Sequence, residues 1–112
     1  MGIYRPGRPA KYMPATGQGH KPPHLPGLYR IRNHKGEIVY IGETCDLARR
    51  IGEHIRSGKI SITRRRASTV EFQVASPDSD SYSRRAHERK KIAQHKPVLN
   101  KSGGGEGRVA AR

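Results

Sequence analysis

The chain has 112 residues, of which 32% are hydrophobic, so it can bury the core of one small domain and little more. Its 23 Lys and Arg residues outnumber its 9 Asp and Glu residues, and the formal net charge of +14 favours a polyanionic partner. The single cysteine, Cys45, excludes an intramolecular disulfide and a cysteine-based zinc site, and no apolar run is long enough to cross a membrane. We therefore expect a soluble, cytoplasmic protein.

Residues 1–26 are basic and rich in proline and glycine. They hold six of the eight prolines, four Lys or Arg residues and no acid, a composition typical of a flexible arm. The tripeptide Gly2-Ile3-Tyr4 lies in this segment, but Arg5-Pro6-Gly7 follows at once and leaves no space for a strand. We expect the folded domain to begin at Gly27.

Two runs of alternating polar and apolar residues, 28–33 and 37–42, are rich in Tyr, Ile and Val and are separated by His34-Lys35-Gly36. Aromatic and β-branched residues in this alternation are typical of strands, and a glycine suits the turn between them. The pattern predicts a β-hairpin. A third run, residues 70–74, alternates in the same way and predicts another strand with one buried face.

A helix is predicted between a capping residue, Asp46, and a stop signal, Ser57-Gly58. Its apolar residues repeat every four positions and are Leu47, Ile51 and Ile55. Arg50 and His54 have the same spacing, and each precedes the next apolar residue by one. They are therefore expected on a second stripe, about 100° around the helix from the apolar one and beside the edge of the sheet.

A second helix is predicted from about Ser81 to His95. Asp80 can cap its start, and Pro97 disfavours helical angles at the residue before it. Its apolar stripe is thin and consists of Tyr82, Ala86, Ile92 and Ala93. Basic residues cover most of the remaining surface, so one face is expected to point toward solvent or phosphate.

Four separated signatures resemble those of the GIY-YIG nuclease family. Gly27-Leu28-Tyr29 matches the first signature, with Leu for Ile, and Tyr40-Ile41-Gly42 matches the second. Arg50 lies eight residues after the glycine of the second signature, where the family keeps its catalytic arginine, and His54 stands where several members carry a functional histidine. The closing pattern of a metal-binding glutamate, an apolar residue, a proline and an asparagine is matched by Glu88, Ile92, Pro97 and Asn100.

The resemblance covers residues 27–100 and implies a small α/β (α+β) domain with a three-stranded antiparallel sheet flanked by helices. This agrees with the strands and helices that the periodicity predicts. We accordingly expect a flexible basic arm over residues 1–26, a nuclease-like domain over 27–101 and a flexible glycine-rich tail over 102–112. The residues expected to support the site without reacting are Gly27, Gly42 and Asn100.

Hydrolysis of a phosphodiester requires an activated water, a group that stabilises the charged transition state and help for the leaving 3′-oxygen. Glu88, which the resemblance makes the metal ligand, is a hard oxygen ligand suited to Mg²⁺, with Mn²⁺ as an alternative. Arg50 offers phosphate a planar, permanent charge. Tyr29 is expected to take the proton of the attacking water, assisted by Tyr40 and His54. Because free tyrosine titrates near about 10, its neighbours would have to lower its pKa.

Each of these residues also has an ordinary structural interpretation, as an aromatic residue in a strand, a solvated charge on a helix or a turn former. The sequence also departs from the family at one position. Glu43 directly follows the second signature, where some members carry a lysine. A carboxylate there adds no positive charge and would oppose a lowered tyrosine pKa.

Three functions compete. The first is an endonuclease acting on duplex or branched DNA and leaving 5′-phosphate and 3′-hydroxyl ends, the products that the resemblance implies. The others are a catalytically silent nucleic-acid-binding module of the same fold and a basic RNA-binding accessory protein. The intact set of Tyr29, Tyr40, Arg50 and Glu88 favours the endonuclease, because a carboxylate facing a polyanion weakens binding unless a cation sits on it.

The source of specificity stays open. The sequence shows no zinc finger and no helix-turn-helix, so recognition of DNA shape, a separate specificity partner and a homodimer are all alternatives. The basic residues expected to contact nucleic acid, through phosphates and without reading its sequence, are Arg49, Arg64, Arg65, Arg66, Arg84, Arg85, Lys90 and Lys91.

Overall fold

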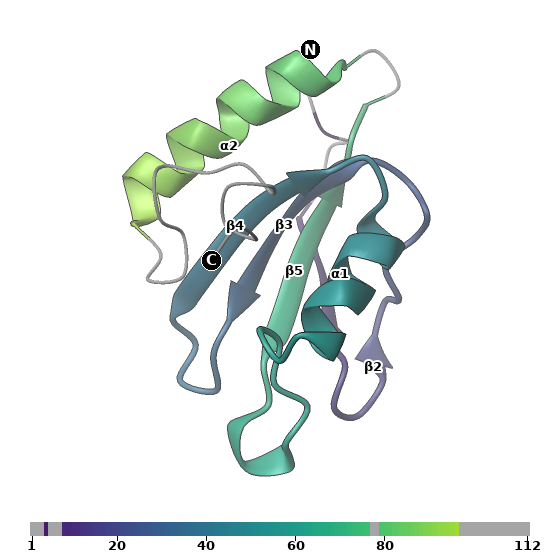
Figure 1. The fold of residues 1–112 in the computed structure, drawn as a ribbon, viewed down its shortest axis with the longest axis vertical. Helices are drawn as coiled ribbons and strands as arrows, with labels where there is room; N and C mark the ends of the chain where they lie inside the picture. The colour runs from purple at the N-terminus through teal and green to yellow at the C-terminus, as the bar shows by residue number, and fades with distance from the viewer. Residues whose placement is uncertain (1–3, 5–7, 77–78, 97–112) are drawn as a thin grey trace.

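The computed structural model describes residues 4, 8–76 and 79–96. They form a mixed α/β fold in which a five-stranded antiparallel sheet carries two α-helices (Figure 1). The strands are β1 (Ala10–Met13), β2 (Gln18–Gly19), β3 (Gly27–Arg32), β4 (Ile38–Thr44) and β5 (Thr69–Val74). The helices are α1 (Leu47–Arg56), α2 (Ser81–His95) and the short 3₁₀ helix η1 (Arg64–Arg66).

The predicted hairpin and third strand are confirmed. Strands β3 and β4 pair antiparallel with Tyr29 opposite Gly42, and β3 also pairs with β5, where Phe72 lies opposite Tyr29. The strand order β2-β1-β5-β3-β4 therefore places β4 at one edge of the sheet. The hairpin turn contains Gly36 with φ +85°, a left-handed conformation that favours glycine.

The sheet has five strands and not the predicted three. Strand β1, from the segment predicted to be a flexible arm, pairs with β5 through Ala10–Phe72 and Tyr12–Val70, and β2 folds back onto β1. Pro9 and Pro14 flank β1, so these prolines delimit the strand and do not interrupt its hydrogen bonds. Parts of the predicted arm, residues 1–3 and 5–7, and the whole predicted tail lie outside the described residues.

The same N-terminal segment also closes the start of α1. Asp46 caps the helix by accepting a hydrogen bond from the Arg49 backbone N–H at 3.0 Å. The N–H groups of the first two helical residues, Leu47 and Ala48, donate to the carbonyls of Leu25 and Pro23, respectively. Because all of these donors lack partners within the helix, residues 23–25 complete the cap that the sequence predicted for Asp46 alone.

The main core lies between the sheet and α1. Its buried residues come from three strands, from α1 and from the loop after α1, and they are Tyr29, Ile31, Tyr40, Leu47, Ile51, Ile60, Val70 and Phe72. A smaller cluster of Leu28, Ile41 and Ile92 lies on the opposite face of the sheet, beneath α2. Because side chains alternate along each strand, Tyr29 and Tyr40 point into the main core and their neighbours Leu28 and Ile41 point to the opposite face, beneath α2.

Helix α2 lies along the β4 edge of the sheet (Figure 1). Its predicted bounds are confirmed, and Asp80 caps it. Its predicted apolar stripe is confirmed at Ile92 and wrong at the other three positions, since Tyr82 is 75% exposed and both alanines of the stripe are exposed. The buried residues of α2 are Arg84, Glu88 and Ile92, so the helix packs mainly through charged side chains. Within the described ranges, no helix has the length and apolar character needed to cross a membrane.

Candidate active site

The hairpin brings the two signature tyrosines onto the face of the sheet that α1 covers. Tyr29 lies on β3 and Tyr40 on β4, and their ring centroids are 5.9 Å apart. Both rings are buried, with relative exposures of 1% and 0%. The two phenols are adjacent because β3 and β4 pair antiparallel, with Tyr29 opposite Gly42 and Ile31 opposite Tyr40.

The glycines of the two signatures leave space for these packed side chains. A Cβ at Gly42 would lie 2.8 Å from Cε1 of Tyr29 and closer still to its Cζ and hydroxyl oxygen. A Cβ at Gly27 would lie 2.7 Å from Cδ1 of Leu47 and would also meet the backbone oxygen of Gln73. Both positions therefore require close approach, the first by the Tyr29 phenol and the second by α1 and β5.

His54 of α1 completes a cluster of three rings. Its Nε2 is 2.7 Å from the Tyr29 hydroxyl, and its ring meets the edge of Tyr40 with centroids 5.1 Å apart. The side chain is 2% exposed. Burial, reinforced by the positive charges of Arg50 and Lys59, lowers the pKa of His54 to about 3. The imidazole is therefore neutral at pH 7.

Tyr40 is the second buried phenol of the cluster. Its hydroxyl is buried and has no hydrogen-bond partner of good geometry within the described part of the chain. Burial raises the pKa of Tyr40 above its ordinary value, and the adjacent Tyr29 hydroxyl and Arg50 guanidinium offset part of that rise. The ammonium of Lys59 stands over the ring, 4.3 Å from its centroid. Tyr40 is therefore a neutral phenol at pH 7.

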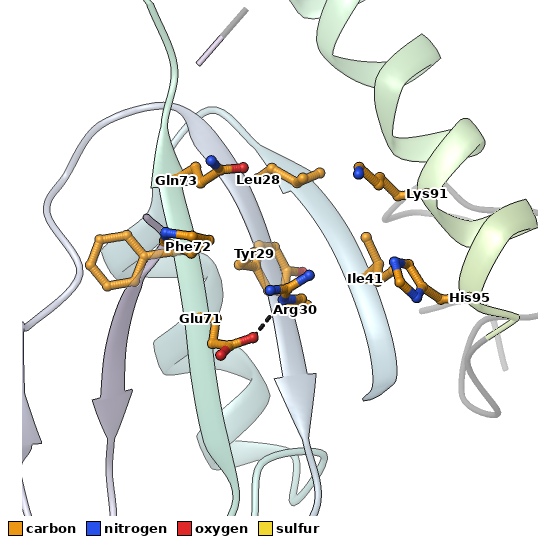
Figure 2. Close-up of a pocket in the computed structure, with 10 residues that line it drawn as sticks. Leu28, Tyr29, Arg30, Ile41, Glu71, Phe72, Gln73, Lys91 and His95 are labelled. Atoms are coloured by element: carbon orange, nitrogen blue, oxygen red, sulfur yellow. Dashed lines mark hydrogen bonds and ion pairs between the residues drawn. The ribbon is translucent and has the colours of Figure 1, made fainter. Parts of the chain in front are cut away.

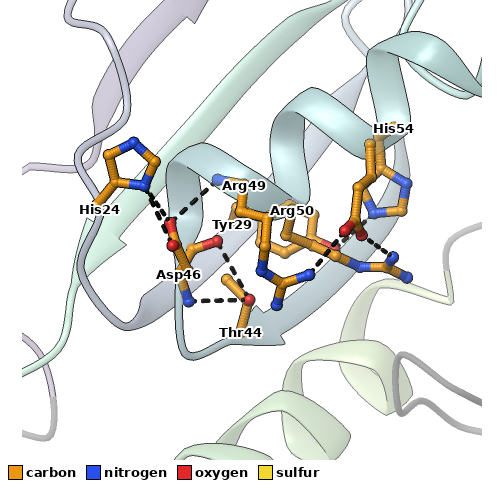
Figure 3. A network of polar contacts seen from close by, with 8 residues as sticks. His24, Tyr29, Thr44, Asp46, Arg49, Arg50 and His54 are labelled. Carbon is orange, nitrogen blue, oxygen red and sulfur yellow. Dashed lines mark hydrogen bonds and ion pairs between the residues drawn. The ribbon is translucent and has the colours of Figure 1, made fainter.

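Arg50 lies one helical turn before His54 on α1 (Figure 3). Its side chain is 12% exposed, and Nη1 donates to Oε1 of Glu53 at 2.7 Å. Arg49 donates to the other oxygen of the same carboxylate, also at 2.7 Å, but its side chain is 47% exposed. Glu53 thus holds both arginines, of which Arg50 faces the tyrosines and Arg49 faces solvent.

Glu88 approaches the same region from α2. Its Oε2 accepts a hydrogen bond from the backbone N–H of Glu43 at 3.1 Å, and the residue is 2% exposed. Because β4 is an edge strand, this outward N–H has no neighbouring strand to bond to. The negative charge of Glu88 contributes to the raised pKa of Tyr40, so the carboxylate and the phenol interact across the edge of the sheet.

Glu43 faces away from the tyrosines, because strand alternation directs it to the α2 layer. There its carboxylate accepts a hydrogen bond from Nε of Arg84 at 3.1 Å, and Nε of Arg85 lies 3.8 Å away. Arg84 is 7% exposed and also donates to Ser79. The assignment of Arg84 as a phosphate contact is therefore corrected: it is a buried partner of Glu43, and an exposed guanidinium is found at Arg85 instead.

The other predicted nucleic-acid contacts are dispersed. The three arginines of η1 are exposed at the end of the loop before β5, far from α2 in Figure 1. On α2, Arg85 and Lys90 are exposed, whereas Lys91 is half-buried. Arg49 lies on α1 beside the tyrosine cluster. Of the predicted contacts, Arg49 shares a helix with Arg50 and His54, and Arg84 and Arg85 reach Glu43, whose backbone N–H bonds Glu88.

Two participants were missed by sequence reasoning. Glu53 stands three and four residues after Arg50 and Arg49, a spacing from which the ion pairs on the helix surface follow. Lys59 lies in the loop after α1, and no spacing in the sequence indicates that it covers Tyr40. Asn100 and Pro97, the end of the closing pattern, lie outside the described residues.

The donor set at Glu88 limits which metal it suits. No group of three or more His, Cys, Asp or Glu side chains close enough to share an ion occurs in the described ranges. Zinc sites require three or four such ligands. A single hard carboxylate suits Mg²⁺, which keeps most of its water ligands and takes one or two carboxylates.

The structure thus brings together the residues of four of the signatures: two buried tyrosines on a hairpin, an arginine and a histidine on α1 and a glutamate on α2. A model of the GIY-YIG catalytic domain matches residues 25–102, most of the chain. The chain belongs to the GIY-YIG nuclease family, and the predicted resemblance is confirmed.

The chain is similar to proteins named UvrABC system protein C. The one from Microcystis aeruginosa is 34% identical over 83 residues, and the one from Lactiplantibacillus plantarum is 32% identical over 81 residues. Both alignments cover 70% of this chain but only 13% of the relative. The one from Finegoldia magna is 44% identical over 39 residues, which are 35% of this chain and 6% of the relative. No solved structure matches significantly.

Proposed function

We propose that this protein is a divalent-metal-dependent endonuclease that hydrolyses DNA phosphodiester bonds and leaves 5′-phosphate and 3′-hydroxyl ends. One observation carries the proposal: the buried Tyr29–His54 hydrogen bond lies beside Arg50 and Tyr40 at the strand edge where Glu88 is anchored. The net charge of +14 and membership of a nuclease family make DNA the favoured substrate.

In this proposal the proton leaves the attacking water through Tyr29. His54 is neutral, so its Nε2 can accept a hydrogen bond from the Tyr29 hydroxyl and carry part of the positive charge that develops. A pKa of about 3 makes His54 a weak base in the free protein. A bound phosphate would raise that pKa, because an anion nearby stabilises the imidazolium. The relay is therefore expected to operate with substrate bound.

Arg50 has the role of binding the phosphate oxygens. Glu53 binds one side of its guanidinium, and the other side faces Tyr40 and the neighbouring rings. The charge is permanent, so it serves both the bound phosphodiester and the transition state. Glu88 has the role of binding Mg²⁺ or Mn²⁺, which when bound would supply positive charge for the phosphate and the leaving 3′-oxygen.

A second candidate function is a catalytically silent module that binds nucleic acid. The observation that favours it is burial: Tyr29, Tyr40, His54 and Glu88 are each no more than 2% exposed. A phosphate can contact these side chains only if the residues that cover them at the β4 edge move away. A module of this kind would bind DNA without cleaving it.

The test incubates the protein with supercoiled plasmid, linear duplex and branched DNA, in Mg²⁺, Mn²⁺ or EDTA. Glu88→Gln is compared with Glu37→Gln, which alters an exposed glutamate at the end of the hairpin turn. We expect metal-dependent cutting that Glu88→Gln slows at least about 100-fold, since a metal contributes several kcal/mol to the transition state. Absence of cutting by wild type, with DNA binding retained, would favour the silent module.

A further inference from the structure

A cavity of about 210 Å³ lies on the face of the sheet opposite α1, against the C-terminal half of α2 (Figure 2). Tyr29 and Phe72 of the main core also line it from the strands between the two faces, although strand alternation directs the side chains of Leu28 and Arg30 to the face opposite that of Tyr29. Its apolar lining includes Leu28 and Ile41, and its polar lining includes Arg30, Glu71, Gln73, Lys91 and His95. The volume is below the roughly 300 Å³ at which pockets for drug-sized ligands begin, so it suits a ligand of about one ring system.

Positive charge surrounds the cavity. Arg30 and Arg32 both donate through Nε to Oε1 of Glu71, so a single carboxylate serves two guanidiniums. Lys91 adds a third positive charge from α2. The pKa of His95 is lowered by its partial burial and then by the charges of Arg30, Lys91 and Arg32. An anion in or beside the cavity would be attracted by this excess of positive charge.

The cavity also has a defined position relative to Glu88. Lys91 and His95 follow Glu88 by three and seven residues, so all three lie on one face of α2. At about 1.5 Å per residue they are displaced about 4.5 and 10.5 Å along the helix axis. Successive nucleotides of a stacked strand are spaced by about 3.4 Å. A strand whose phosphate meets Glu88 would therefore bring a residue one to three nucleotides away to the cavity.

We propose that this cavity binds one unpaired nucleotide of a nucleic-acid strand, a few positions from the phosphate held at Glu88. The base would pack on Leu28 and Ile41, the Gln73 amide offers both a donor and an acceptor to its edge, and Lys91 would meet its phosphate. A paired base cannot enter without leaving the duplex. The position of this nucleotide site next to the site of cutting rests on the proposed function, but the binding of a nucleotide in the cavity does not.

A second hollow, of about 350 Å³, extends this surface toward the hairpin turn. It shares Glu71 with the first cavity, and its lining includes Lys11, Arg32 and His34. The two hollows and the Arg30–Glu71–Arg32 cluster thus form a basic track across the face of the sheet that α1 does not cover. A single strand fits such a track, whereas a rigid duplex would contact only its rim.

The first experiment detects occupancy of the cavity by NMR in EDTA, so that no strand is cut. The full-length protein is titrated with a single-stranded thymidine tetranucleotide, with a blunt duplex and with inorganic phosphate. We expect the tetranucleotide to shift the Leu28 and Ile41 methyl signals and to raise the pKa of His95, and the duplex to leave the methyls unchanged. Unmoved methyls at saturating tetranucleotide, or an equal effect of inorganic phosphate, would overturn the nucleotide site.

The second experiment compares variants that remove the same charge from α2. Lys91→Gln alters the cavity, whereas Arg89→Gln alters the exposed side of the helix. We expect Lys91→Gln to weaken single-strand binding about tenfold, which is about 1.4 kcal/mol, and Arg89→Gln about twofold. Equal losses would overturn the proposal. Gln73→Ala keeps every charge and is expected to weaken binding about fivefold, a result that no general loss of charge explains.

Failure of this inference can be told from failure of the proposed function. If wild type cuts no DNA but the tetranucleotide moves the cavity signals, the endonuclease proposal falls and the nucleotide site stands. If wild type cuts DNA and Lys91→Gln cuts duplex and single-stranded flaps with unchanged KM, the endonuclease stands and the cavity has no part in binding its substrate.

Discussion

Replacing His54 by glutamine should remove much of the acid sensitivity of this fold. His54 is 2% exposed, and burial with the nearby charges of Arg50 and Lys59 lowers its pKa from 6.5 to about 3. A lowered pKa means that the folded state binds fewer protons than the unfolded state. The contribution of neutral His54 to the free energy of unfolding is therefore fully present above about pH 6.5 and is lost as the pH falls toward about 3.

The size of the effect follows from this shift. At pH 5 the unfolded chain carries the proton on His54 and the folded chain does not. That pH lies about 1.5 units below the unfolded pKa, and each unit corresponds to about 1.36 kcal/mol, so the unfolding free energy falls by about 2 kcal/mol. Any folded pKa below about 4 gives nearly the same loss. For a domain of this size, about 2 kcal/mol is a large part of the total stability.

The assay is urea unfolding at pH 7, 6 and 5 of wild type, His54→Gln and, as a control, His34→Gln, which alters an exposed histidine of the hairpin turn. Two further histidines with lowered pKa, His87 and His95, are common to all three proteins and cancel in the comparison. We expect the difference between wild type and His54→Gln to change by about 2 kcal/mol from pH 7 to pH 5. Parallel losses would refute the buried, neutral histidine.

Three further predictions address the tyrosine layer and the ion pair beneath α2. Gly42→Ala should destabilise the protein by about 1–3 kcal/mol in urea unfolding, because the added carbon overlaps the Tyr29 ring; no loss would contradict the close approach. Tyr40→Phe should keep or raise the melting temperature, since it removes a buried hydroxyl without a well-formed hydrogen bond, while plasmid cleavage slows. Arg84→Ala should cost about 3–5 kcal/mol by leaving the buried Glu43 carboxylate with only the longer contact to the exposed Arg85, against less than about 1 for Arg85→Ala; equal losses would contradict the buried Arg84–Glu43 pair.

The elements that sequence analysis predicted correctly are those set by neighbouring residues. The hairpin follows from alternation around Gly36, and α1 follows from an N-cap and apolar residues four apart. Strand β1 follows from no such local signal. It exists because Tyr12 and Ala10 find partners on β5, about sixty residues later, and the composition between Pro9 and Pro14 gives no sign of that pairing.

The packing of α2 was beyond prediction for a different reason. Apolar residues normally indicate the buried face of a helix, and on α2 they indicate Tyr82. Tyr82 is exposed, however, whereas the charged residues Arg84 and Glu88 are buried. These charges are buried because each has a specific partner on β4: the Glu43 carboxylate for Arg84 and the Glu43 backbone N–H for Glu88. Pairings of this kind depend on which strand lies at the edge, and that order is a property of the whole sheet.

The edge strand explains why the candidate site is built where it is. An edge leaves backbone N–H groups without partners, and here Glu88 of α2 accepts one of them directly after the second tyrosine signature. The bond that closes the edge therefore also fixes the carboxylate proposed to bind the metal. Residue 42 must be small to admit the Tyr29 ring on one face, while residue 43 anchors α2 on the other. Gly42 and Glu43 thus join the tyrosine part of the site to the Glu88 part on α2, although more than forty residues separate the two parts in the sequence.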